Sequence, residues 1–294
     1  MSSLSRRDLL KAGIVAGAVA GVGGLNLTAQ TRTAFDKVPL GKSGITATRL
    51  AFGTGSSNGH VQSSLGQKEF SKLVAYAYER GIRFFETAEA YTTPAMLGEA
   101  LKPFPRESYV LMNKVTTDTG ADPHKRFEDM LQTSNTEYFD IMLLHWQHTA
   151  DWPEETKRWQ EGIDTAQAKK TILSRGASVH GLPALQQMPG NPWLQVAMIR
   201  MNQKGTRMDG PDFEDGNNPS YVPVVVDHVH QVKKAGMGVI SMKLCGDGTF
   251  TRHEDRVAAM RFAIQQAHVD CVTVGFKNKQ EIDEAIDNLN LALV

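Results

Sequence analysis

The stretch that decides the fold is GIRFFETAEAY, which runs from Gly81 to Tyr91. Its apolar start, IRFF, is typical of a strand that is covered on both faces. Two carboxylates and a phenol follow at the exit, on Glu86, Glu89 and Tyr91. Because α/β proteins place their chemistry at the C-terminal ends of strands, we expect a functional site there.

Strands and helices alternate regularly along the rest of the chain. A helix is expected before Gly81, because Phe70, Leu73, Val74 and Ala77 recur at helical spacing. Strands are expected at 47–53, 82–87, 109–115, 139–146, 172–178, 194–202, 238–244 and 271–275. Helices are expected at 67–80, 95–102, 123–133, 153–169, 183–188, 223–235, 253–267 and 278–292. This alternation predicts a (β/α)₈ TIM barrel formed as one domain by residues 31–294.

A β-hairpin is predicted over residues 35–50, before the first complete strand–helix unit, as an N-terminal cap. Its turn is the sequence GKSG, from Gly41 to Gly44. A phosphate-binding loop would need a glycine at position 36, where the chain has Asp36. The turn interpretation is therefore favoured.

Charge balance and residue spacing argue against a nucleic-acid partner, a disulfide and a metal site. The 294 residues include 32 acidic and 32 basic side chains, and this balance argues against nucleic acid as a partner. Cys245 and Cys271 fall at opposite ends of neighbouring predicted strands, too far apart for a disulfide, so we expect two free thiols. No metal site is expected: His228 and His230 do not share a helix face, and His180 stands alone in the sequence.

The N-terminus reads as a signal peptide over residues 1–30. A charged start is followed by an apolar run at 12–25, which is shorter than the ~20 residues that span a bilayer. No stable membrane span is therefore expected in the mature form. The pair Arg6–Arg7 and the leucines after it resemble the twin-arginine export signal. The resemblance implies the twin-arginine machinery as a partner, export in the folded state, and a periplasmic or secreted location.

The longest irregular stretch, residues 203–221, holds several acidic side chains. They are Asp209, Asp212, Glu214 and Asp215. We interpret this stretch as a solvated lid or binding loop, with a metal site as the alternative.

Polar residues end several of the predicted strands and should meet at one end of the barrel, which we call the mouth. They are Glu86, Tyr91, Lys114, His145, Lys243 and Lys277. We expect Glu86 to pair with Lys114 on the next strand, and Lys114 to lower the phenol pKa of Tyr91. Taken singly, these residues also fit a structural ion pair that closes the mouth. Their grouping on consecutive strands favours proton-transfer chemistry.

The chain from about Val38 onward resembles the aldo-keto reductase superfamily. The resemblance rests on PLGKSGITATRLAFGTG, FFETAEAYTTPAMLGEALK, VLMNKV, YFDIMLLHW and VGFKNKQEIDEA. It implies a catalytic tetrad of Glu86, Tyr91, Lys114 and His145. In this tetrad Tyr91 would donate a proton to a small-molecule carbonyl substrate, and NADPH would supply the hydride. Glu86 departs from the family, which has Asp at this position.

The resemblance also implies a cofactor site. Ser178 would contact the nicotinamide, and phosphates would lie at Lys243, Gly246, Gly248, Gly275 and Lys277, with the 2′-phosphate at Lys277. The cofactor site departs further from the family than the tetrad does. The family's usual polar or basic residues are replaced here by Val179, Met198, Glu281 and Ala285.

Two alternatives for the function remain open. One is a Schiff-base aldolase acting through Lys114 or Lys243. The other is an exported barrel that binds a small molecule or partner with little or no turnover.

Overall fold

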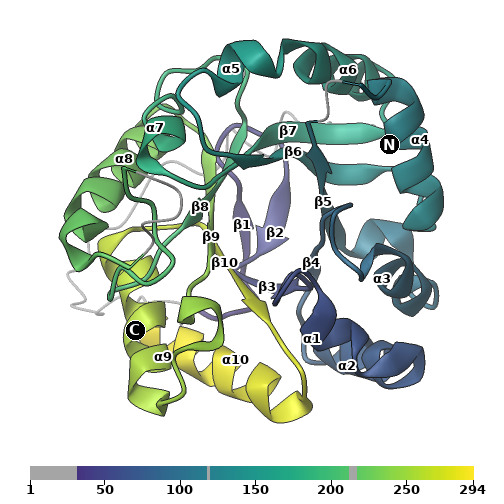
Figure 1. The fold of residues 1–294 in the computed structure, drawn as a ribbon. Coiled ribbons are helices and arrows are strands. Elements are labelled where there is room, and N and C mark those ends of the chain that lie inside the picture. Colours follow the sequence, from purple (N-terminus) through teal and green to yellow (C-terminus); the bar gives the residue numbers. More distant parts are fainter. Residues whose placement is uncertain (1–31, 118–119, 212–216) are drawn as a thin grey trace, which may run out of the picture. The chain divides into compact units, whose positions relative to one another are not determined.

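A computed structural model of the chain describes residues 32–117, 120–211 and 217–294. Within these residues, eight parallel strands form a closed barrel in the order β10-β3-β4-β5-β6-β7-β8-β9. They are β3 (Leu50–Gly53), β4 (Phe84–Glu86), β5 (Val110–Thr116), β6 (Phe139–Gln147), β7 (Ile172–Val179), β8 (Val196–Arg200), β9 (Gly238–Met242) and β10 (Cys271–Gly275). The predicted TIM barrel is confirmed (Figure 1).

Helices surround the strands and cover their outer faces (Figure 1). They are α1 (His60–Ser63), α2 (Gly66–Glu79), α3 (Pro94–Leu101), α4 (Pro123–Thr133), α5 (Trp152–Glu155), α6 (Lys157–Ala168), α7 (Leu182–Leu185), α8 (Val222–Lys234), α9 (His253–Arg261) and α10 (Lys279–Leu293). α2 buries the four apolar residues that its spacing predicted. Gly81 follows it with φ of 107°, and a Cβ there would lie 2.9 Å from the Phe35 ring. Glycine therefore ends this helix for both conformational and steric reasons.

Three expected elements are divided in the structure. The strand expected at 47–53 is split into β2 (Thr46–Thr48), which pairs with the first strand of the hairpin, and β3, which joins the barrel. The helix expected at 153–169 is split into α5 and α6 at Thr156. The Thr156 hydroxyl donates to the Trp152 carbonyl at 2.7 Å, a local bond that competes with a continuous helix. Only the first part of the helix expected at 253–267 is α-helical, because Phe262–Gln266 forms a π-helix.

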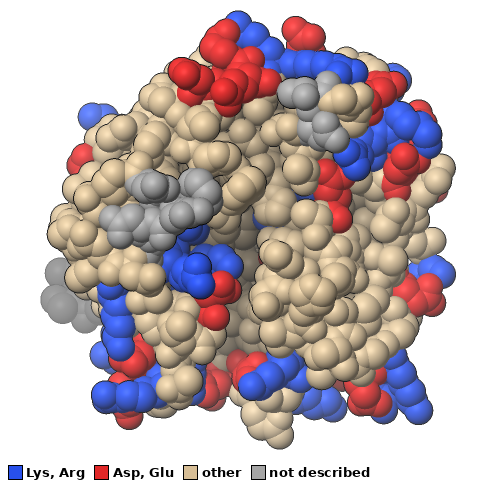
Figure 2. All heavy atoms as spheres, in the orientation of Figure 1, with Lys and Arg blue, Asp and Glu red and all other residues tan. Residues whose placement is uncertain are grey.

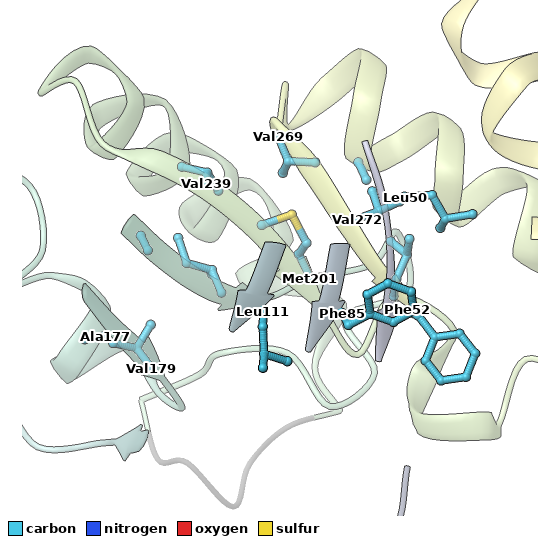
Figure 3. Close-up of a cluster of buried hydrophobic side chains, with 14 of the residues drawn as sticks. Leu50, Phe52, Phe85, Leu111, Ala177, Val179, Met201, Val239, Val269 and Val272 are labelled. Carbon is cyan, nitrogen blue, oxygen red and sulfur yellow. The ribbon is translucent and has the colours of Figure 1, made fainter. Parts of the chain in front are cut away.

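Two apolar layers hold the barrel together. Outward strand residues pack against the helices, and Figure 3 shows part of this layer, with Phe52, Phe85 and Leu111. Inward residues of the strands form a second cluster inside the barrel, which includes Phe84 and Met112. The predicted hairpin, β1 (Lys37–Pro39) with β2, contributes Leu40 to this inner cluster and so covers one end of the barrel.

The boundary predicted near residue 30 stays a prediction, since the signal-peptide segment lies outside the described residues. Among the residues that are described, no helix is long and apolar enough to cross a membrane. Cys245 and Cys271 are both free thiols, as expected.

Candidate active site

Side-chain alternation places the polar residues at the mouth. On β5, Val110 and Met112 belong to the inner cluster, and Lys114 is the next residue in the same inward series. On β6, His145 follows Ile141 and Leu143 in the same way. The interior is therefore apolar along most of its length and becomes polar only at the C-terminal ends of the strands.

Glu86 and Lys114 form the ion pair that the sequence predicted. The Lys114 ammonium donates to Glu86 Oε1 and, at 2.8 Å, to the Thr87 carbonyl. The Lys114 side chain is fully buried and that of Glu86 is 3% exposed. Burial lowers the pKa of Lys114, although the neighbouring Glu86 carboxylate acts in the opposite direction. The ammonium is thus held by the Glu86 carboxylate and by a backbone carbonyl.

Tyr91 lies between Lys114 and His145. Its ring centroid is 4.7 Å from Lys114 Nζ, and it meets the His145 ring edge to face at 5.6 Å. Gly55 allows this position, because a Cβ on residue 55 would lie 2.5 Å from the Tyr91 ring and 2.7 Å from its hydroxyl. The four residues of the predicted tetrad, Glu86, Tyr91, Lys114 and His145, are therefore one contiguous group.

The expected effect of Lys114 on Tyr91 is wrong. Burial, followed by the negative charges of Glu86 and Asp247, raises the pKa of Tyr91 well above 10. Burial and these two carboxylates outweigh the Lys114 ammonium, whose own pKa is lowered by burial. The phenol therefore keeps its proton at neutral pH and can act as a proton donor.

A second imidazole completes this part of the mouth. The ring of His180, which follows β7, lies 6.4 Å from the ring of His145. Burial, then the positive charges of Lys114 and Lys243, lowers the pKa of His145 to about 3. Burial also lowers the pKa of His180 well below 6.5, with Arg200 the next cause. Both imidazoles are therefore neutral at pH 7, and His180 Nε2 is buried without a hydrogen-bond partner.

Arg200 ends β8 in the inward series of Val196 and Met198 and donates from Nε to Asp209 Oδ1 at 2.7 Å. Asp209 is 1% exposed, and burial raises its carboxyl pKa to about 6. The interpretation of the 203–221 acids as solvated is therefore wrong for Asp209. Asp212, Glu214 and Asp215 lie outside the described residues. In the described part of the chain, no group of three or more His, Cys, Asp or Glu side chains is arranged to hold a metal.

The predicted phosphate-binding residues lie after β9 and β10. Lys243 Nζ contacts Asp247 Oδ1 at 2.8 Å, and Lys277 Nζ lies 3.6 Å from Glu281 Oε1. The surface is hollowed at the centre of the ring of strands, with basic and acidic groups side by side at its edge (Figure 2). Gly275 is partly exposed, and a Cβ there would lie 2.1 Å from Ser56 Oγ, so glycine allows the close approach of that side chain.

Ser178 is fully buried inside the barrel, and its hydroxyl contacts Met242 Sδ at 3.8 Å. A separate shallow pocket lies elsewhere, between the hairpin and residues that include Arg83, Glu107 and Asp140. None of the predicted site residues lines that pocket.

Sequence reasoning missed His180, Arg200 and Asp247 as parts of this site. The signal for Arg200 was its place two residues after Met198 in an alternating strand. His180 stands two residues after Ser178 in the same way, just beyond the end of β7. Asp247 gave no comparable signal, because its position depends on the backbone of the loop after β9.

Comparison with known proteins gives two family matches. Residues 49–204 match the aldo/keto reductase family, and residues 3–23 match the TAT (twin-arginine translocation) pathway signal sequence. A probable aldo-keto reductase of Glycine max is 27% identical over 179 residues, which are 53% of this chain and 52% of the relative. Methylglyoxal reductase DkgA of Yersinia pestis is 28% identical over 129 residues, 43% of this chain and 45% of the relative. The chain thus spans about half the length of the curated relatives it matches.

Solved structures share the fold. A putative aldo-keto reductase from Pseudomonas aeruginosa has a TM-score of 0.69 at 19% identity, covering 89% of this chain and 98% of its own. An aldo-keto reductase from Klebsiella pneumoniae, solved with NADPH, has a TM-score of 0.64 at 15% identity, with 86% and 89% covered.

Proposed function

Because this chain is a member of the aldo/keto reductase family, we propose that it is an oxidoreductase that reduces the carbonyl group of an aldehyde or ketone with NADPH. The observation that carries the proposal is the position of Tyr91, between the buried Lys114–Glu86 pair and the neutral ring of His145. The relatives named methylglyoxal reductase support a small carbonyl compound as substrate.

In this proposal Tyr91 donates the proton that the carbonyl oxygen needs as it becomes a hydroxyl. A general acid must be protonated at the working pH, and the raised pKa of Tyr91 satisfies this condition. In the reverse reaction, oxidation of an alcohol, the phenolate of Tyr91 would accept the proton.

Lys114 and Glu86 act as positioning residues. Lys114 Nζ lies beneath the Tyr91 ring, and Glu86 with the Thr87 carbonyl fixes the ammonium. The neutral imidazole of His145 can donate a hydrogen bond to the carbonyl oxygen, which would set the substrate's orientation. His180 offers a second neutral imidazole beside it.

NADPH, when bound, supplies the hydride. The donor set at the mouth fits an anionic dinucleotide in kind: Lys243 and Lys277 carry ammonium groups, and Gly248 has open space around its Cα. Ser178, Lys243, Gly246, Gly275 and Lys277 are the residues that we propose would hold it.

The test is turnover by the purified protein. We expect NADPH consumption with a panel of small aldehydes that includes methylglyoxal, and native mass spectrometry would show whether a nucleotide co-purifies. A protein that binds NADPH but reduces no member of the panel would favour the binding-protein alternative. Trapping of a carbonyl substrate by borohydride would instead favour the Schiff-base alternative.

Export to the periplasm in the folded state is also proposed, on the twin-arginine match at residues 3–23. Replacing Arg6 and Arg7 by Lys should keep the precursor in the cytoplasm, as measured by cell fractionation. Unchanged export of that variant would contradict the proposal.

A further inference from the structure

The two lysines that we propose for cofactor phosphates share one feature. Each is paired with a carboxylate four residues later in the chain, Lys243 with Asp247 and Lys277 with Glu281. One lysine lies just after β9 and the other just after β10, in loops with different conformations. The shared feature is therefore a carboxylate at the place where a cofactor phosphate would bind.

The loop after β9 is bent so that Asp247 meets Lys243. Both residues have left-handed backbone, with φ of 57° for Lys243 and 55° for Asp247. Such backbone is uncommon for residues other than glycine and usually costs free energy. The ion pair that results is partly exposed, at 27% and 28%, and pairs of this kind stabilise a fold by only about 0–1 kcal/mol. Fold stability alone therefore gives little reason for this arrangement.

The Asp247 carboxylate acts on the mouth. Its negative charge is one of three causes that raise the pKa of Tyr91, so the carboxylate lies within electrostatic reach of the proposed proton donor. Lys243 in turn contributes to the lowered pKa of His145. The Lys243–Asp247 pair therefore borders the proposed reaction centre.

Glu281 is the second of the two carboxylates, the one that pairs with Lys277. Its Oε2 accepts from the Lys277 backbone N–H at 2.9 Å, and Asn278 Oδ1 accepts from the Glu281 N–H at 2.9 Å. These groups stand at the start of the 15-residue helix α10, where backbone N–H groups favour an anion. The side chains of Glu281 and Asn278 thus accept hydrogen bonds from the Lys277 and Glu281 N–H groups, and Glu281 also pairs with the Lys277 ammonium.

We propose that Asp247 and Glu281 are internal counter-ions that hold the places of cofactor phosphates, and that a dinucleotide binds by displacing them. This inference rests on the proposed function. A phosphate carries more negative charge and more acceptor oxygens than a carboxylate, so it can replace one on a lysine. Before the cofactor binds, the two carboxylates would neutralise Lys243 and Lys277. Each carboxylate would then weaken the binding of the phosphate with which it competes.

The two carboxylates make different predictions. The pyrophosphate is common to NADPH and NADH, so removal of the charge at Asp247 should strengthen the binding of both equally. The 2′-phosphate belongs only to NADPH, so removal of the charge at Glu281 should strengthen the binding of NADPH more than that of NADH. Asp247→Asn is a mild change, since asparagine tolerates left-handed backbone well. Glu281→Gln keeps an acceptor for the Lys277 N–H.

The experiment is calorimetric titration of the purified protein and its variants with NADPH and with NADH. We expect Asp247→Asn to tighten both by about two- to tenfold, and Glu281→Gln to tighten NADPH alone by a similar factor. Asp129→Asn is the matched control, because Asp129 forms an exposed pair with Lys125 four residues away on α4. Equal or weaker binding by both site variants, with the parent protein binding normally, overturns the inference and leaves the proposed function standing. Absence of dinucleotide binding in the parent and all variants overturns both.

Discussion

The two halves of the mouth hold their charges in different ways. On the side of β4 to β6, Lys114 and Glu86 come from neighbouring strands, and both side chains are almost completely buried. On the side of β9 and β10, Lys243 and Lys277 each pair with a carboxylate four residues later in the chain, and their side chains are partly exposed. The first kind of pair depends on closure of the barrel, whereas the second can open without disturbing it.

This difference sets what each half can do. Breaking a buried pair leaves an uncompensated charge in the interior, which costs about 3–5 kcal/mol. Opening an exposed pair costs at most about 1 kcal/mol. The buried half is therefore suited to hold Tyr91 in one geometry, and the exposed half is suited to exchange one anion for another.

The largest effect is expected for the buried pair. Glu86→Gln should lower the free energy of unfolding by about 3–5 kcal/mol, because the Lys114 ammonium loses its partner in a buried site. Urea unfolding followed by circular dichroism would measure it. Glu99→Gln, which breaks an exposed pair with Lys102, should cost less than about 1 kcal/mol. Similar small costs for both variants would remove the distinction between the two halves.

The position of Tyr91 can be tested without changing a polar residue. Gly55→Ala would place a methyl group 2.5 Å from the Tyr91 ring, so the ring must move. A displacement of about 1 Å in a catalytic group lowers rates by roughly a hundredfold, and we expect a loss of that order in kcat. NADPH affinity should stay close to that of the parent. An unchanged kcat would show that the exact place of the phenol is unimportant.

The barrel architecture was within reach of the sequence. Helical spacing before Gly81 and apolar runs such as IRFF are local signals, and they found the barrel strands in the right order. The tetrad followed from its resemblance to a family. The direction of the Tyr91 pKa shift did not follow, because burial and the charge of Asp247 depend on tertiary structure. His180 gives no local signal of a site because it stands alone in the sequence, and only the fold brings it beside His145.

Acid should lower the free energy of unfolding because the buried imidazole of His145 is neutral in the folded state. The pKa of His145 falls from 6.5 to about 3 on folding, so its protonation favours the unfolded chain. The neutral ring's contribution is present above pH 6.5 and is lost as the pH falls toward 3. The raised pKa of Asp209 acts with the opposite sign, because that carboxyl favours the folded state when it is protonated.

A pair of unfolding measurements isolates this effect. Between pH 7 and pH 4.5 the parent should lose about 1–3 kcal/mol more unfolding free energy than His145→Gln, which cannot be protonated. An equal loss in both proteins would mean that His145 titrates normally in the folded state. In that case, its description as a neutral hydrogen-bond donor would be wrong below pH 7.

The central claim is that Tyr91 performs proton transfer while the other half of the mouth binds the cofactor. The most direct measurement is the single-turnover rate of carbonyl reduction by Tyr91→Phe, taken with its NADPH affinity. The variant removes only the hydroxyl. We predict a rate lower by about 10²–10⁴-fold with NADPH affinity almost unchanged. A variant that reduces the substrate as fast as the parent would contradict the account, because the tetrad would then not be the active site.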